Sequence, residues 1–337
     1  MRNVLMLCAV VLICFSAAAQ DAAVNSYTVT PIVTNANDAN LINPWGLSRP
    51  VKSSLPENEW WASDQMTGVS TLYDANGTIK PLIITIPPAS GSGKGSPTGT
   101  AFNANNFAFV TTDGTVQNWF AGTKPAKPGT QCAECHTTTA VIMVNNAAKK
   151  ASYTGMTVAS NTYFVANSTG GVEAYNANTF APVTLNSGAF VDPNIPTSYT
   201  PFGIQAIGSD IYVTFYNSTA GGGYVDAFDP AGKLLLSLAH GQFSEPWGVV
   251  KAPANFGAFS GAILVGNTAS GKIGAYNATS GKLEGFMKTS TGSTIVIPGL
   301  WGLSFGNGSA DSGPTTTLYY NAGGNYLMGT FGAVTFN

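Results

Sequence analysis

The chain has 337 residues, only 9% of them charged, and its formal net charge at pH 7 is −2. No basic stripe runs along it, so we expect neither nucleic acid nor an anionic membrane surface as a partner. Its 39 glycines and its many Thr, Asn, Val, Tyr and Phe residues are typical of an all-β protein with tight turns.

The N-terminus has the pattern of a secretory signal peptide. Arg2 precedes an apolar run from Val4 to Phe15, and Ala17 to Ala19 form an A-x-A cleavage site. We therefore expect residues 1–19 to be removed. Residues 20–337 are then exported to the periplasm or the extracellular space, an oxidising compartment. No later apolar run is long enough to span a membrane as a helix, and we expect a monomer.

The first predicted strand of the mature chain, residues 27–33, comes before any repeat. It has no sheet of its own, so we expect it to pair beside Val334–Phe336 and to close a ring with the end of the chain. Pro31 has no N–H to donate to a strand ladder, which suits an edge position.

A short pattern that ends in glycine recurs six times along the chain. The six glycines are Gly46, Gly99, Gly155, Gly203, Gly248 and Gly302. After each copy come an apolar strand, a polar turn, a strand that ends in an aromatic residue, and an Asn- or Asp-containing turn before a fourth strand. Four strands in each of six units predict an all-β, six-bladed β-propeller, in which each blade buries its faces against its neighbours.

The repeated glycine has a predicted place in this fold. It lies in the first strand of each blade, and we expect it at the crowded centre of the ring, where backbones approach closely. A β-sandwich with extra strands is the alternative fold, but six nearly even repeats fit a sandwich poorly. We expect one domain over residues 20–337, with a loop insert at residues 121–139 in the second blade.

That insert contains the pentapeptide Cys132-Ala133-Glu134-Cys135-His136, which has the C-x-x-C-H spacing of haem c attachment. The two thiols can add to the two vinyl groups of one haem, and His136 can then bind the iron as the proximal ligand. The only other cysteines, Cys8 and Cys14, lie in the predicted leader. The sequence therefore predicts haem c as a cofactor.

Other interpretations of this motif stay open. Cys132 and Cys135 could form a disulfide, or with His136 they could be part of a zinc site that lacks a fourth ligand. The sixth ligand of a haem iron is not specified by the sequence. Its candidates are Met143, Met156 and His240, and we expect Met143 to point into a blade interface.

A second candidate site lies at the axial mouth of the ring. Four aromatic residues recur where first strands begin: Trp45, Phe202, Trp247 and Trp301. We favour packing between blades as their role, with an aromatic-lined ligand pocket as the alternative. Asp64 and Asp113 lie in turns on the same predicted face, at equivalent points of the first two blades. Two carboxylates offer few oxygen ligands, so we do not expect calcium.

Several longer stretches resemble an uncharacterised family of exported bacterial proteins. These stretches are Asn43–Leu47, Gly68–Tyr73, Ala252–Gly261 and Gly299–Gly308. That family is in turn similar to NHL-type and TolB-like propellers. The resemblance implies a six-bladed propeller and an exported location, and it implies no known activity.

Three functions follow from these observations, in order of preference. The first is an exported c-type haem protein that passes electrons to a redox partner protein, with the propeller as the docking scaffold. The second is a cofactor-free binding or interaction scaffold with a Cys132–Cys135 disulfide. The third is a calcium-dependent, lactonase-like hydrolase. No catalytic residue is predicted, because a nucleophilic triad would have to use His240.

Overall fold

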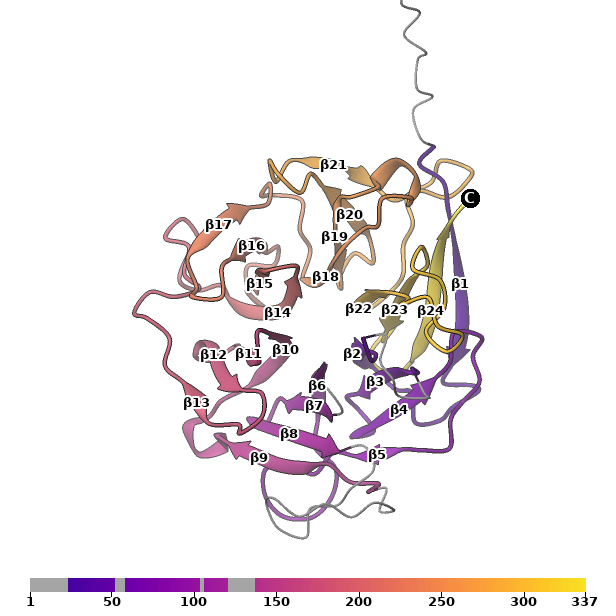
Figure 1. The fold of residues 1–337 in the computed structure, drawn as a ribbon. Coiled ribbons are helices and arrows are strands. Elements are labelled where there is room, and N and C mark those ends of the chain that lie inside the picture. The colour runs from indigo at the N-terminus through magenta and orange to yellow at the C-terminus, as the bar shows by residue number, and fades with distance from the viewer. Residues whose placement is uncertain (1–23, 52–57, 104–105, 121–136) are drawn as a thin grey trace, which may run out of the picture.

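Runs of β-branched and aromatic residues, separated by glycine- and asparagine-containing turns, form 24 strands in the computed structural model, which describes residues 24–51, 58–103, 106–120 and 137–337. The strands make six antiparallel sheets of four strands each, arranged as blades around a central axis (Figure 1). The predicted six-bladed propeller is therefore confirmed. The described helices are two single turns of 3₁₀-helix, η1 (Ala147–Lys149) and η2 (Gly257–Phe259).

The four strands of each blade follow one another from the axis outwards. Blade 1 consists of β2 (Pro44–Ser48), β3 (Trp60–Asp64), β4 (Val69–Tyr73) and β5 (Ile84–Thr85). Blade 2 consists of β6 (Pro97–Asn103), β7 (Asn106–Thr111), β8 (Thr115–Phe120) and β9 (Val141–Asn145). Blade 3 consists of β10 (Tyr153–Ala159), β11 (Thr162–Asn167), β12 (Gly171–Asn176) and β13 (Pro182–Val183).

The second half of the ring repeats this order. Blade 4 consists of β14 (Thr200–Ile207), β15 (Asp210–Tyr216), β16 (Tyr224–Phe228) and β17 (Leu234–Ser237). Blade 5 consists of β18 (Pro246–Lys251), β19 (Ile263–Asn267), β20 (Ile273–Tyr276) and β21 (Leu283–Phe286). Blade 6 consists of β22 (Leu300–Phe305), β23 (Leu318–Ala322), β24 (Thr330–Phe336) and β1 (Tyr27–Thr34).

Blade 6 joins the two ends of the described chain. Its outer strand β1 runs antiparallel to β24, with Tyr27 opposite Phe336 and Val29 opposite Val334. Pro31 lies on the edge of the sheet beside a register shift, where its missing N–H breaks no ladder. The side chain of Tyr27 is buried, and its hydroxyl donates a hydrogen bond of 2.9 Å to the Phe256 carbonyl oxygen in blade 5. The predicted ring closure is confirmed.

The repeated glycines lie where neighbouring inner strands come closest. A Cβ added to Gly203 in blade 4 would lie 2.2 Å from the carbonyl oxygen of Trp247 in blade 5. A Cβ on Gly302 in blade 6 would lie 2.7 Å from the carbonyl oxygen of Trp45 in blade 1, so the contacts run around the whole ring. The other four close approaches involve Gly46, Gly99, Gly155 and Gly248. The predicted place of this glycine is confirmed.

Each inner strand also contains a β-bulge at its repeat. The pairing with the second strand shifts register between Pro44 and Leu47 in blade 1, and between Pro201 and Ile204 in blade 4. The remaining four shifts follow Pro97, Tyr153, Pro246 and Leu300. Because a bulge redirects a side chain, the residue before the glycine can turn towards the axis instead of into a blade interface.

Apolar side chains fill the spaces between blades. One cluster joins blades 3 and 4 through residues such as Phe164, Phe190 and Val213, and the other blade interfaces have similar clusters. In the described part of the chain, we find no helix with the length and apolar character needed to cross a membrane.

We expect Gly203→Ala to destabilise the ring, because the new methyl group would overlap the Trp247 backbone of the next blade. Overpacking of this kind costs about 1–3 kcal/mol of unfolding free energy, which denaturant unfolding can measure. Gly155→Ala is the matched control, since the nearest atom to its added Cβ lies 3.1 Å away. Equal losses in the two variants would contradict this account of the axis.

Candidate functional site

The C-x-x-C-H segment connects β8 to β9, and its own residues lie outside the described part of the chain: Cys132, Cys135 and His136. Its described ends are fixed to the propeller. The Trp119 indole Nε1 donates a hydrogen bond of 2.6 Å to the Thr137 carbonyl oxygen. The Thr85 N–H donates to the Thr138 carbonyl at 2.7 Å, and the Ala140 N–H donates to the Thr85 carbonyl at 3.0 Å. Both ends are thereby held where blade 2 meets the outer strand of blade 1.

An apolar cluster lies beside these ends. The rings of Trp61 and Phe107 stack with their centroids 3.8 Å apart, and the Trp119 ring lies 4.9 Å from that of Trp61. Ile84 and Ala140 are buried in the same cluster. The segment therefore begins and ends on a packed wall formed by blades 1 and 2.

The three candidates for a sixth haem ligand lie in different places. Met143 is 38% exposed on β9, so the prediction that it points into a blade interface is wrong. Its neighbours Ile142 and Val144 pair with adjacent residues of β8, which leaves Met143 at a bulge on the outer strand. Met156 is buried on the inner strand of blade 3. His240 follows blade 4, with its ring 4.8 Å from that of Tyr224.

At the axial mouth, the four predicted aromatic residues come together. The rings of Trp45 and Trp301 stack with their centroids 3.8 Å apart. The Phe202 ring lies 6.0 Å from that of Trp45, and the Trp247 ring lies 5.9 Å from that of Trp301. Trp45 belongs to blade 1 and Phe202 to blade 4, so the contact between these two rings crosses the axis. The expected packing between neighbouring blades is therefore found for Trp301 with Trp45 and with Trp247. The Trp45–Phe202 contact adds packing across the channel, because the bulges turn these side chains inwards.

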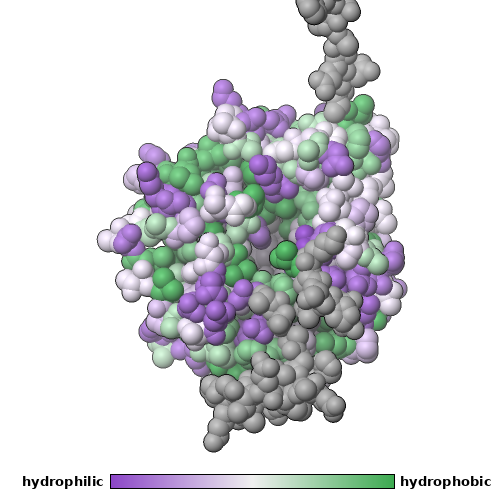
Figure 2. Space-filling view, in the orientation of Figure 1, coloured by the Kyte–Doolittle hydropathy of each residue, from purple (hydrophilic) through white to green (hydrophobic). Residues whose placement is uncertain are grey.

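Hydrogen bonds fix two of these rings. The Trp247 Nε1 donates to the Thr154 carbonyl oxygen at 2.9 Å, and the Trp301 Nε1 donates to the Asn43 Oδ1 at 3.0 Å. A further cavity along the axis, lined in part by Gly46 and Met156, has a volume of only about 20 Å³, room for about one water molecule. Figure 2 shows a hollow at the centre of the ring on the face in view.

A larger cavity of about 450 Å³ lies beside the aromatic cluster, between blades 3 and 4. Phe202 and Tyr216 form its aromatic part, with ring centroids 5.0 Å apart. The rest of its lining consists of Ser, Thr and Asn side chains, including Ser198, Thr200 and Ser218. Of the predicted pocket residues, Phe202 lines this cavity. Its size suits a small molecule, and its lining suits an uncharged polar one.

Asp64 is completely buried at the end of β3. The Thr71 hydroxyl donates to its Oδ2 at 2.8 Å, while its Oδ1 has no hydrogen-bond partner among the described residues. Burial raises the pKa of this carboxyl well above its ordinary value, and the nearby Asp38 raises it further. Asp64 is therefore a buried hydrogen-bonding group whose protonated form is favoured by its surroundings.

Asp113 is not the structural equivalent of Asp64. Asp64 pairs with Pro44 in blade 1, and the residue that pairs with Pro97 in blade 2 is Thr111. Asp113 lies two residues further on, where it accepts hydrogen bonds from the Thr111 hydroxyl and from the Ala89 N–H at 2.6 Å. Within the described ranges, no three His, Cys, Asp or Glu side chains come close enough to share a metal ion.

Sequence reasoning did not single out a third group of polar residues, centred on Glu173 in blade 3. Its carboxylate accepts hydrogen bonds from the hydroxyls of Tyr153 and Tyr175. The two-residue spacing of Glu173 and Tyr175 places both side chains on one face of β12. This spacing could have predicted from the sequence that the two side chains lie together. Asn146 reaches the two tyrosines from the loop after blade 2. No local sequence pattern indicates that contact.

No protein-family model matches the chain. It is 28% identical over 313 residues to the uncharacterised protein L690 of Acanthamoeba polyphaga mimivirus, an alignment that covers 84% of this chain and 79% of the relative. It is 27% identical over 307 residues to the uncharacterised protein R648 of the same virus, covering 84% and 74%. These relatives are viral and their names assign no activity, so the resemblance to an exported bacterial family stays a prediction.

Solved structures of other proteins share the fold. A protein of unknown function from Bacteroides thetaiotaomicron has a TM-score of 0.58 and 10% identity, covering 92% of this chain and 76% of that one. Virginiamycin B lyase from Staphylococcus aureus has a TM-score of 0.51 and 12% identity, covering 93% and 100%. At these identities the likeness concerns the propeller fold alone.

We expect Asp64→Asn to change how stability depends on pH. In the unfolded chain the carboxyl ionises near its ordinary pKa of 3.8, whereas the folded chain keeps it protonated to higher pH. As the pH rises between these two pKa values, wild type should lose up to about 1.4 kcal/mol of unfolding free energy per pH unit relative to Asp64→Asn. Denaturant unfolding over a pH series measures the difference. Parallel curves for the two proteins would show that Asp64 ionises normally in the folded state.

Proposed function

We propose that this protein is an exported β-propeller that carries one covalently bound haem c and takes part in electron transfer. The observation that carries the proposal is the C-x-x-C-H pentapeptide between β8 and β9, on a segment whose two ends are fixed to the rim of the ring. The donor set fits the cofactor, since Cys132 and Cys135 supply two thiols and His136 supplies an imidazole.

The residues of the chain have separate roles in this proposal. Cys132 and Cys135 would hold the haem through thioether bonds, and His136 would bind its iron. The bound haem would supply a one-electron redox couple. The wall formed by Trp61, Phe107 and Trp119 supports the proposal because it offers the segment a rigid apolar base. The closed ring would serve as the docking surface for a redox partner protein.

The test is expression with the leader in a host that matures c-type cytochromes. We expect a Soret band that survives acid–acetone extraction and an intact mass increased by one haem. Cys135→Ser should lose a thioether bond or the haem, and His136→Ala should change the spectrum while the propeller stays folded. His240→Ala is the matched control and should leave the spectrum unchanged, because His240 follows blade 4 whereas the segment joins two strands of blade 2. A colourless wild-type protein with the mass of the polypeptide alone would overturn the proposal.

A cofactor-free binding scaffold is the second candidate function. The observation that favours it is the cavity of about 450 Å³ beside the axial aromatic cluster. In this case Cys132 and Cys135 would form a disulfide. A colourless exported protein whose mass rises by two hydrogens on reduction would support this candidate over the haem protein.

A further inference from the structure

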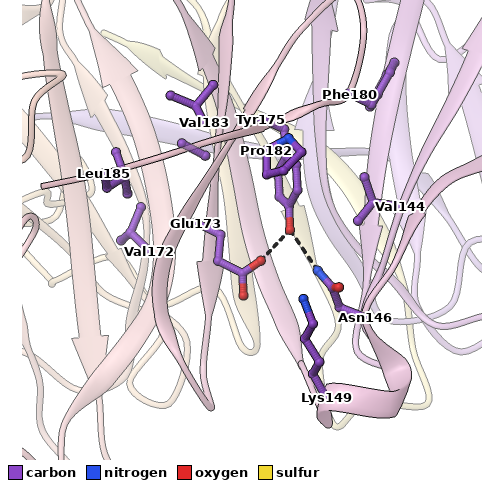
Figure 3. A pocket seen from close by; sticks show the side chains of 11 residues that line it. Val144, Asn146, Lys149, Val172, Glu173, Tyr175, Phe180, Pro182, Val183 and Leu185 are labelled. Atoms are coloured by element: carbon purple, nitrogen blue, oxygen red, sulfur yellow. Dashed lines mark hydrogen bonds between the residues drawn. The ribbon is translucent and has the colours of Figure 1, made fainter.

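A separate cavity of about 340 Å³ opens between blades 2 and 3 (Figure 3). It lies among β9, η1, β12 and β13, and it shares no lining residue with the cavity at the axial mouth. Its volume falls in the range of small-molecule sites, which are typically apolar with a few converging polar groups.

The polar part of this cavity is a fixed hydrogen-bond network around Glu173. Its Oε2 accepts from the hydroxyl of Tyr175 and from that of Tyr153, the latter at 2.8 Å. Its Oε1 accepts from the Asn167 side-chain amide at 2.7 Å. The Asn146 Nδ2 donates to the two tyrosine oxygens at 2.7 and 2.9 Å. Tyr153 and Tyr175 are buried, so the network holds Glu173 and Asn146 in place.

Three polar groups at this end of the cavity remain available. A carboxylate can accept about four hydrogen bonds, and Glu173 uses three. The Asn146 amide nitrogen donates its two hydrogen bonds to the hydroxyl oxygens of Tyr153 and Tyr175. Its Oδ1 accepts no hydrogen bond from any described residue. The ammonium group of Lys149 lines the same cavity and forms no ion pair with a described side chain. The site thus offers one carboxylate, one amide oxygen and one cation.

The remaining walls are apolar. In Figure 3, Val172, Val183 and Leu185 lie on one side of the cavity and Val144 and Phe180 on the other, while the polar ends of Glu173, Asn146 and Lys149 gather between and below them. An apolar group could enter between these walls, with charged groups of both signs close to one another at its polar end.

We propose that this cavity binds a free amino acid with an apolar side chain. The α-ammonium donates to Glu173 and to the Asn146 Oδ1, the α-carboxylate pairs with Lys149, and the side chain lies against the valine, leucine and phenylalanine walls. A simple amine would leave Lys149 unmatched, and a simple carboxylate would lie against Glu173 with no ammonium to offset the repulsion. The cavity shares no lining residue with the proposed haem ligands or with the wall formed by Trp61, Phe107 and Trp119.

Titration calorimetry of the full exported protein with L-leucine tests this site. Leucinamide removes the carboxylate charge and N-acetyl-leucine removes the ammonium. Each should bind about tenfold or more weakly than leucine, because each loses a charge-assisted contact. Absence of saturable leucine binding, or equal binding of leucine and leucinamide, would overturn the proposal.

Two lysine variants identify the cation. In Lys149→Gln, leucine and leucinamide should bind with nearly equal affinity, because the partner of the carboxylate is gone. Lys150→Gln removes the adjacent lysine, which does not line the cavity, and should keep the preference for leucine. Both lysines are exposed, so neither change should prevent folding. An unchanged preference in Lys149→Gln would show that leucine binds elsewhere.

Discussion

The close approach of inner-strand backbones around the axis is the constraint on which the rest of the ring depends. At each of the six repeats a glycine faces the backbone of the next blade, and the sixth faces the first, so every inner strand is in close contact with both of its neighbours. Pairing of β1 with β24 then ties the two ends of the described chain into blade 6. Packed interiors accommodate added volume poorly. In a closed ring, a larger side chain at one blade interface should therefore strain the other interfaces as well.

This rigid ring positions three different sites. The bulges beside the glycines turn Trp45, Phe202, Trp247 and Trp301 towards the axis, where their rings pack against one another beside a cavity. The outer strands of blades 1 and 2 fix both ends of the segment that contains the cysteines. The gap between blades 2 and 3 holds a hydrogen-bonded carboxylate beneath apolar walls. Each site combines residues from at least two blades, so each depends on how the blades are spaced.

The sequence could predict the blades, the place of the glycines and the ring closure, because all three follow from a repeated local pattern. It could not predict the contacts made across the axis, since a bulge decides where Trp45 and Phe202 point. The matching of Asp64 with Asp113 failed for a related reason: strand pairing makes Thr111 the equivalent residue. The prediction for Met143 was wrong because a bulge on β9 turns this side chain outwards. Asn146 meets Tyr175 across a blade interface, a contact between residues 29 positions apart that no periodicity indicates.

Native-state hydrogen exchange followed by mass spectrometry tests the central claim, that the six blades form one cooperative unit locked at the axis. If it is right, the amides of β2, β6, β10, β14, β18 and β22 exchange only through global opening, with one common free energy equal to that of unfolding. If one blade exchanges as a unit at a distinctly lower free energy than the others, the axial contacts do not bind the ring together in the way described.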